Sequence, residues 1–137
     1  MKTRDPRSLT QIEGEAWPAP GPEATRLMKT VHDLRDVPVP DLTIENLRTL
    51  LSQKVGVDVL TPLVLDFLDA DPLAGGDFYP GDLLTAFLRC HPRTSGSAEL
   101  ITRIEKLIER VPEEGNLEES KTLHHTIWSS IDEWHRT

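Results

Sequence analysis

The strongest constraint on the fold is a run of apolar residues at helical spacing in the middle of the chain. It consists of Val57, Leu60, Leu63, Val64, Phe67 and Leu68. This spacing places all six on one face of a helix, and such a face must be buried to be stable. Asp58, Asp66 and Asp69 fall on the other side of the same helix. The sequence therefore predicts a core helix that also presents carboxylates to solvent.

A defined break follows this helix. Asp71-Pro72 disfavours further helix, because a residue before proline is pushed out of the α region. Gly75-Gly76 gives the backbone the freedom that a turn requires. Pro80 suits the first turn of a new helix, where the amide that proline lacks would have no partner. The predicted inner face of this next helix consists of Leu83, Leu84, Phe87 and Leu88.

Two helices are predicted before the core helix. The first covers Glu23–Arg35 and is opened by Pro22, with Glu23 at the positive end of the helix dipole. The second covers Ile44–Lys54, with Thr43 as its N-cap. Pro62 then either kinks the core helix or marks its first turn. The predicted inner faces are Leu27, Met28, Val31 and Leu34 in the first helix, and Ile44, Leu47, Leu50 and Leu51 in the second.

Two more helices are predicted after a polar loop. The first is stopped by Pro112 and Gly115, and Asn116 with Glu119 resembles a capping box for the last helix. Charged residues fill the faces opposite the apolar ones. The inner faces are Leu100, Ile101, Ile104, Leu107, Ile108 and Val111, and then Leu117, Leu123, Ile127, Trp128, Ile131 and Trp134.

The pattern as a whole predicts an all-α fold. Six or so helices, short breaks and no alternating strand pattern are typical of a compact helical bundle. A length of 137 residues is that of one domain. Residues 1–22 are expected to form a partly flexible N-terminal strap anchored by Trp17, because the prolines after Trp17 exclude regular helix. Residues 23–137 are expected to form the helical domain.

The charge of the chain bears on its partner. The net charge is −8, and six aspartates lie between Lys54 and Arg89 without one Lys or Arg among them. Phosphate binding needs a cationic surface, so this balance argues against nucleic acid as a direct partner and favours a basic protein. Acidity that serves only solubility is the alternative.

The same stretch supplies the candidate partner-binding residues, which are Asp58, Asp66, Asp69, Asp71, Asp77, Tyr79 and Asp82. Exposed carboxylates of this kind can steer a cationic partner toward the surface. The alternative is that Asp77 and Asp82 cap turns and helix starts while the other aspartates are merely solvated.

No cofactor, metal site or catalytic residue is predicted. Cys90 is the only cysteine, so the chain has no internal disulfide and a reducing compartment is favoured. His124 and His125 are adjacent and point about 100° apart on a helix, so they cannot chelate one ion together. No run approaches the roughly 20 apolar residues of a membrane span, and the start of the chain lacks the apolar region of a secretory signal. A cytoplasmic protein without a membrane partner is expected.

Three segments carry a resemblance to a known family. They are EGEAWPAPGPEATRL, DLTIENLRTLLSQKVGVDVLTPLVLDFLDADPL and, above all, GGDFYPGDLLTAFLR. Read in order, they resemble the helical immunity proteins of bacterial contact-dependent growth inhibition (CDI) systems, the CdiI-type family. The resemblance covers about residues 8–90, and its longest motif extends from Gly76 to Leu84. Within that motif Phe78 and Pro80 are expected to be structural.

The resemblance implies a function without catalysis. Such proteins bind and silence the C-terminal toxin domain of a CDI effector that a neighbouring sibling cell delivers, and these toxins are often nucleases. An acidic inhibitor suits the cationic groove with which a nuclease holds phosphates. The inhibitor would occlude the active site or the substrate groove.

Two other classes of function stay open at this point. One is an acidic helical scaffold or adaptor that holds a basic host protein. The other is an enzyme that gathers His32, His91 or His125 with an aspartate in a pocket. The identity of the toxin and the oligomeric state are not determined by the sequence.

Overall fold

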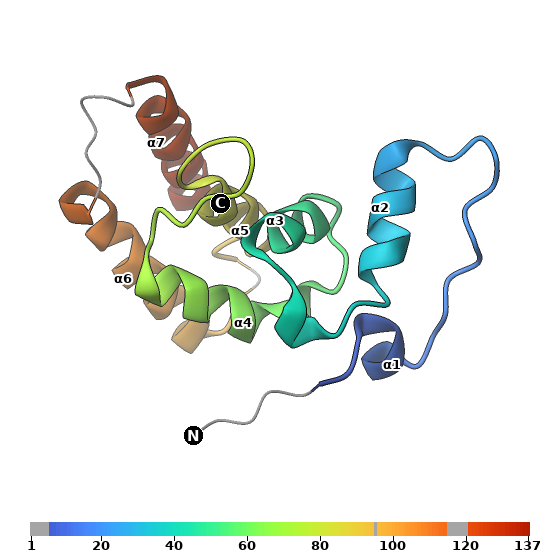
Figure 1. The fold of residues 1–137 in the computed structure, drawn as a ribbon. Coiled ribbons are helices and arrows are strands. Elements are labelled where there is room, and N and C mark those ends of the chain that lie inside the picture. Colours follow the sequence, from blue (N-terminus) through green and yellow to red (C-terminus); the bar gives the residue numbers. More distant parts are fainter. Residues whose placement is uncertain (1–5, 95, 115–120) are drawn as a thin grey trace.

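Helices make up the whole regular structure of the described chain (Figure 1). The computed structural model describes residues 6–94, 96–114 and 121–137, and the side chains of all these except 112–114 and 121–125. Within those ranges there is no strand, which confirms the predicted all-α class. The helices are α1 (Leu9–Glu13), α2 (Arg26–Leu34), α3 (Ile44–Ser52), α4 (Val57–Ala70), α5 (Asp82–Cys90), α6 (Ala98–Glu114) and α7 (Lys121–Arg136), with a 3-10 helix at Val39–Asp41.

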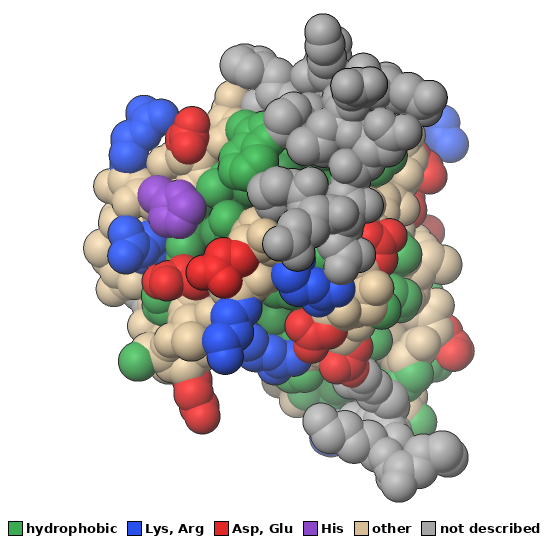
Figure 2. Space-filling view, turned by 90° about the vertical axis from the view of Figure 1, so that its left-hand side faces the viewer, with side chains coloured by type: hydrophobic (Ala, Val, Ile, Leu, Met, Phe, Trp, Pro, Cys, Tyr) green, Lys and Arg blue, Asp and Glu red, His purple; other side chains and the backbone are tan. Residues whose placement is uncertain are grey.

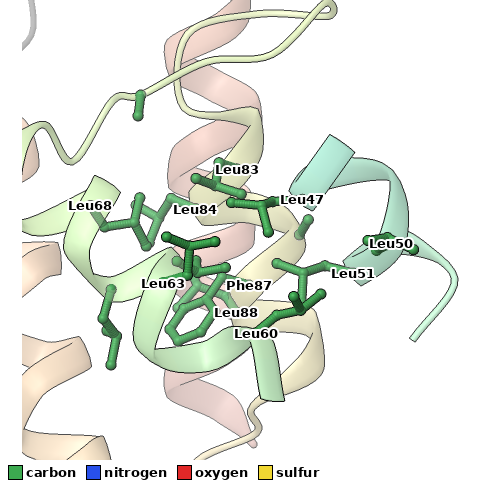
Figure 3. Close-up of a cluster of buried hydrophobic side chains, with 14 of the residues drawn as sticks. Leu47, Leu50, Leu51, Leu60, Leu63, Leu68, Leu83, Leu84, Phe87 and Leu88 are labelled. Atoms are coloured by element: carbon green, nitrogen blue, oxygen red, sulfur yellow. The ribbon is translucent and has the colours of Figure 1, made fainter. Parts of the chain in front are cut away.

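The centre of the core is formed by α3, α4 and α5 (Figure 3). α5 packs against α3, α4 and α7, and every residue from Asp82 to Leu88 is buried. The predicted inner faces of these helices are confirmed, except that Ile44 of α3 and Val57 and Phe67 of α4 are only half-buried. Leu65, which the periodicity did not place inside, is buried because α6 covers a second side of α4. The cluster in Figure 3 includes Leu47, Leu50, Leu51, Leu60, Leu63, Leu68, Leu83, Leu84, Phe87 and Leu88.

α6 and α7 complete the core on the other side. Ile104 and Val111 of α6 and Ile131 and Trp134 of α7 are buried. The indole Nε1 of Trp134 donates a hydrogen bond of 2.7 Å to the carbonyl of His91, which joins α7 to the end of α5.

The structure resolves two predictions about prolines. α6 extends two residues past Pro112 and ends at Glu114, directly before position 115, the second of the two predicted stops. Pro62 lies in the second turn of α4, which excludes the alternative that it marks the first turn. The capping box predicted at Asn116 and Glu119 lies outside the described residues.

α2 differs from its prediction in its start and its buried face. It begins at Arg26, because the hydroxyl of Thr25 accepts a hydrogen bond from the amide of Met28 and caps the helix there. Glu23 is consequently not in the helix. Val31 and Leu34 are buried against the core, but Leu27 is 43% and Met28 56% exposed. The prediction that both belong to the core is wrong.

The segment expected as a strap is held by a buried arginine. Arg35, at the end of α2, pairs with the carboxylate of Glu13 and donates a hydrogen bond of 2.7 Å to the carbonyl of Glu15. Its guanidinium lies 4.2 Å from the ring centroid of Trp17. Trp17 therefore contacts the body through a cation–π interaction and stays partly exposed. Leu9 of α1 is fully buried, so this end of the chain adds to the core.

Candidate partner-binding surface

The loop from Gly75 to Gly81, here called the 75–81 loop, is organised by one buried carboxylate. Asp82 is the first residue of α5 and only 3% exposed. Its side-chain oxygens accept hydrogen bonds from the amides of Gly76 (2.6 Å), Phe78 (3.1 Å) and Tyr79 (3.4 Å). The negative charge also lies at the positive end of the α5 dipole. Asp82 therefore caps the turn, the alternative considered above, and its carboxylate is not at the surface.

An ion pair on α3 holds the other side of the loop. Arg48 donates two hydrogen bonds of 2.6 Å to the carboxylate of Glu45, and these bonds, the largest cause, lower the pKa of Glu45. Glu45 in turn accepts a hydrogen bond of 2.9 Å from the amide of Asp77. A Cβ atom at Gly76 would collide with Glu45 and approach Asp82, so only glycine fits between these carboxylates. Sequence reasoning did not foresee this contact of Glu45.

A tight turn joins the loop to α5. The amide of Asp82 donates to the carbonyl of Tyr79 at 3.1 Å, and Gly81 has φ +94° and ψ 0°. Proline second and glycine third are the residues of a type II turn. Pro80 therefore precedes the helix instead of lying in its first turn, contrary to the prediction.

Phe78 was expected to be structural, but its ring is exposed on this rigid loop and is not part of the core. It is 69% exposed, and the guanidinium of Arg48 lies 4.1 Å from its ring centroid. Because Glu45 fixes Arg48 from the other side, the ring is supported without being covered. Tyr79 is half-buried beside it.

The aspartates of α4 lie on its exposed side, as predicted. Asp58, Asp66 and Asp69 fall within about 80° of the helix circumference and extend over about 17 Å. The end of this stripe is neutralised by α6, because Arg103 contacts the Asp69 carboxylate at 2.5 Å and Arg110 donates to the Asp69 carbonyl at 2.9 Å. On the side of α6 and α7, the described acidic and basic side chains that are visible are interspersed (Figure 2).

The seven candidate residues thus lie in two places. Three are on α4, and Asp71 follows them, with its carboxylate accepting a hydrogen bond of 2.9 Å from the amide of Leu73. Asp77 and Tyr79 belong to the 75–81 loop, where Asp77 is exposed. Asp82 supports that loop from inside.

The described histidine and cysteine side chains contact different residues. Nδ1 of His32 is 3.7 Å from the carboxylate of its exposed neighbour Asp33. His91 is buried, 3.0 Å from the hydroxyl of Thr61, and burial lowers its pKa while the charge of Asp58 acts in the opposite direction. The Cys90 thiol donates to the carbonyl of Leu51 at 3.1 Å, and burial raises its pKa, which disfavours the reactive thiolate. The side chain of His125 lies outside the described residues. In the part of the chain that is described, no three His, Cys, Asp or Glu side chains are grouped to hold a metal.

The exposed apolar side chains gather along two adjoining clefts. One, of about 420 Å³, lies between Leu27, Phe78 and the residues that follow α3. The other, of about 310 Å³, lies between α2 and the segment around Trp17, and Leu27 lines both clefts. This surface was missed at the level of sequence, because helical periodicity assigned Leu27 and Met28 to the core. The cap signal of Thr25 was present, but which side of a short helix is covered depends on its neighbours.

A comparison with known protein families gives a match over most of the chain. A sequence model of the family described as CDI immunity proteins matches residues 11–110. That range extends from within α1 to within α6 and contains the whole 75–81 loop. No curated protein and no solved structure matches the chain. None of the helices in the described ranges combines the length and apolar character of a membrane span.

Proposed function

Because this chain belongs to the family of CDI immunity proteins, we propose that it neutralises a cognate toxin by binding that toxin's C-terminal domain and blocking its active site or substrate groove. The observation that carries the proposal is the family match over residues 11–110. The protein acts by occupying a surface and performs no chemistry itself.

The proposal extends to the class of toxin. A nuclease holds its substrate in a cationic groove, and a chain with a net charge of −8 is attracted to such a groove over long distances. Asp58, Asp66, Asp69 and Asp71, with Asp77 and Tyr79 on the loop, are the residues proposed to face the toxin. Exposed charges act mainly on the association rate, and fast association matters because a free toxin turns over many substrates.

The test of this function is direct. The purified chain is mixed with the toxin domain encoded immediately upstream, and the mixture is analysed by size-exclusion chromatography with light scattering. A stable one-to-one complex and loss of nuclease activity in that complex are expected. The absence of a tight complex would refute the proposed function.

Charge reversal tests the role of the aspartates. Asp58→Lys with Asp66→Lys is expected to lower the association rate and to flatten its dependence on salt. Glu105→Lys with Glu109→Lys on α6 is the matched control, because it changes the net charge equally on another helix. Equal kinetics for the two double variants, measured by stopped-flow fluorescence, would show that only the total charge matters.

A further inference from the structure

We infer that the toxin is held by the cleft between Leu27 and Phe78, through an apolar toxin side chain that lies next to an acidic one. This cleft, called the Leu27–Phe78 cleft below, is separate from the aspartates of α4. The inference rests on the proposed function and names the contact that limits dissociation.

The first argument is the exposure of the apolar side chains. Trp17, Leu27, Met28 and Phe78 are 41%, 43%, 56% and 69% exposed, and they are the large hydrophobic residues that the described surface leaves uncovered. Phe78 lines the Leu27–Phe78 cleft, Trp17 and Met28 line the adjoining cleft, and Leu27 lines both. Apolar side chains gathered around a concave surface indicate a binding site, whereas scattered ones need no explanation.

The second argument is rigidity. Phe78 is carried by a loop whose amides are bound by Asp82, and its ring rests on Arg48. Arg48 is itself fixed by two hydrogen bonds to Glu45. A side chain held in place before binding loses little entropy in a complex, so its contact area contributes more fully to affinity. Aromatic and arginine side chains in such settings are typical of interface hot spots.

The third argument is charge. The Leu27–Phe78 cleft is lined by two cationic side chains, Lys54 and Arg89. The same two side chains also line a third cleft, next to α7, whose lining includes one acidic residue, Glu133. Both are exposed, and no ion pair with another described residue is formed by either. Lys54 has φ +56°, a conformation that few residues other than glycine adopt. Two adjacent cations in a chain of net charge −8 fit a carboxylate on the partner.

A second copy of this chain does not fit the cleft. A symmetric dimer brings the same patch of each copy together. The Lys54 and Arg89 side chains of both copies would then share one interface, and two chains of charge −8 would repel each other. A toxin segment that combines an apolar residue with Asp or Glu can place the apolar side chain in the cleft and the carboxylate next to Lys54 and Arg89.

The aspartates of α4 and the cleft therefore have different kinetic roles. Exposed charges change mainly the encounter rate, whereas desolvated apolar contacts change mainly the dissociation rate. Removing the cleft contacts is expected to shorten the lifetime of the complex without slowing its formation.

Surface plasmon resonance with the toxin domain encoded immediately upstream tests the inference. Leu27→Ala with Phe78→Ala is expected to raise the dissociation rate at least about thirtyfold, the effect of losing one interface hot spot. Lys54→Gln with Arg89→Gln is expected to raise it several-fold. Thr102→Ala with Lys106→Gln on α6 is the matched surface control and is expected to change neither rate. Circular dichroism on each variant confirms that the fold is retained.

The outcomes separate the two proposals. A tight wild-type complex whose dissociation rate is unchanged in both cleft variants overturns this inference and leaves the proposed function intact. Absence of any complex with the wild-type chain overturns both. If the free chain is a dimer that the Leu27 and Phe78 substitutions make monomeric, the cleft is a self-association surface and the inference fails.

Discussion

Removing the buried side chain of Asp82 should destabilise the protein more than removing any exposed aspartate of the described chain. Asp82→Ala deletes the carboxylate that the amides of Gly76, Phe78 and Tyr79 share. The neighbouring Asp77 offers a matched control, because it is exposed and its own side chain takes no part in the hydrogen bonds that hold the loop.

The expected magnitude follows from the geometry. Two of the three hydrogen bonds, at 2.6 and 3.1 Å, are well formed, and the third, at 3.4 Å, is long. Hydrogen bonds to a charged group contribute about 1.5–3 kcal/mol each. When the carboxylate is lost, the amides of this half-exposed loop can bind water instead. The lower value of that range therefore applies to each of the two well-formed hydrogen bonds, which gives about 3 kcal/mol for both. Loss of the charge at the start of α5 adds about 0.3–1 kcal/mol.

The free energy of unfolding is measured by denaturant titration followed by circular dichroism. Asp82→Ala is expected to lower it by about 3–4 kcal/mol, whereas Asp77→Ala should stay within about 0.5 kcal/mol of wild type. A loss below about 1 kcal/mol for Asp82→Ala would show that the carboxylate does not organise the loop.

Two further predictions concern the interior. Burial lowers the pKa of His91, so its imidazole takes up a proton more readily in the unfolded chain than in the folded one. The free energy of unfolding is therefore highest above the ordinary pKa of 6.5 and decreases as the pH falls below that value. Denaturant titrations between about pH 8 and 5 should show a slope of at most about 1.4 kcal/mol per pH unit from this group, and His91→Gln should reduce it; an unchanged slope would mean that other groups cause it. Gly81→Ala should cost more than about 1 kcal/mol, because φ is +94° and the new Cβ would lie 2.7 Å from Cδ1 of Ile127. Adding Ile127→Val, which lacks that atom, should recover part of the loss in thermal melts, and a neutral Gly81→Ala would contradict the close approach of α5 and α7.

Local sequence patterns were sufficient to predict features that depend only on residues within one element. The break at Asp71-Pro72 and the cap at Thr43 are confirmed, because they depend on a few neighbouring residues. The inner face of α5 is confirmed as well, since its periodicity is complete and helices surround it. The longest resembling motif falls on the loop that Asp82 holds in place.

Predictions failed where the burial of a side chain depends on a second element that packs over it. Leu27 follows the same periodicity as Val31, yet only Val31 is covered by the core. For Asp82 the sequence left two alternatives, an exposed carboxylate and a cap, and three amides bound to its side chain decide for the cap. The exposure of Leu27 leaves no trace in local spacing.

The sequence by itself determined the helical class, the order of the main helices and the family of this protein, because periodicity, caps and a long motif are properties of contiguous residues. The tertiary structure decided which side chains remain available to a partner. Burial depends on elements distant in the sequence, which cover Asp82, neutralise Asp69 and leave Leu27 and Phe78 exposed.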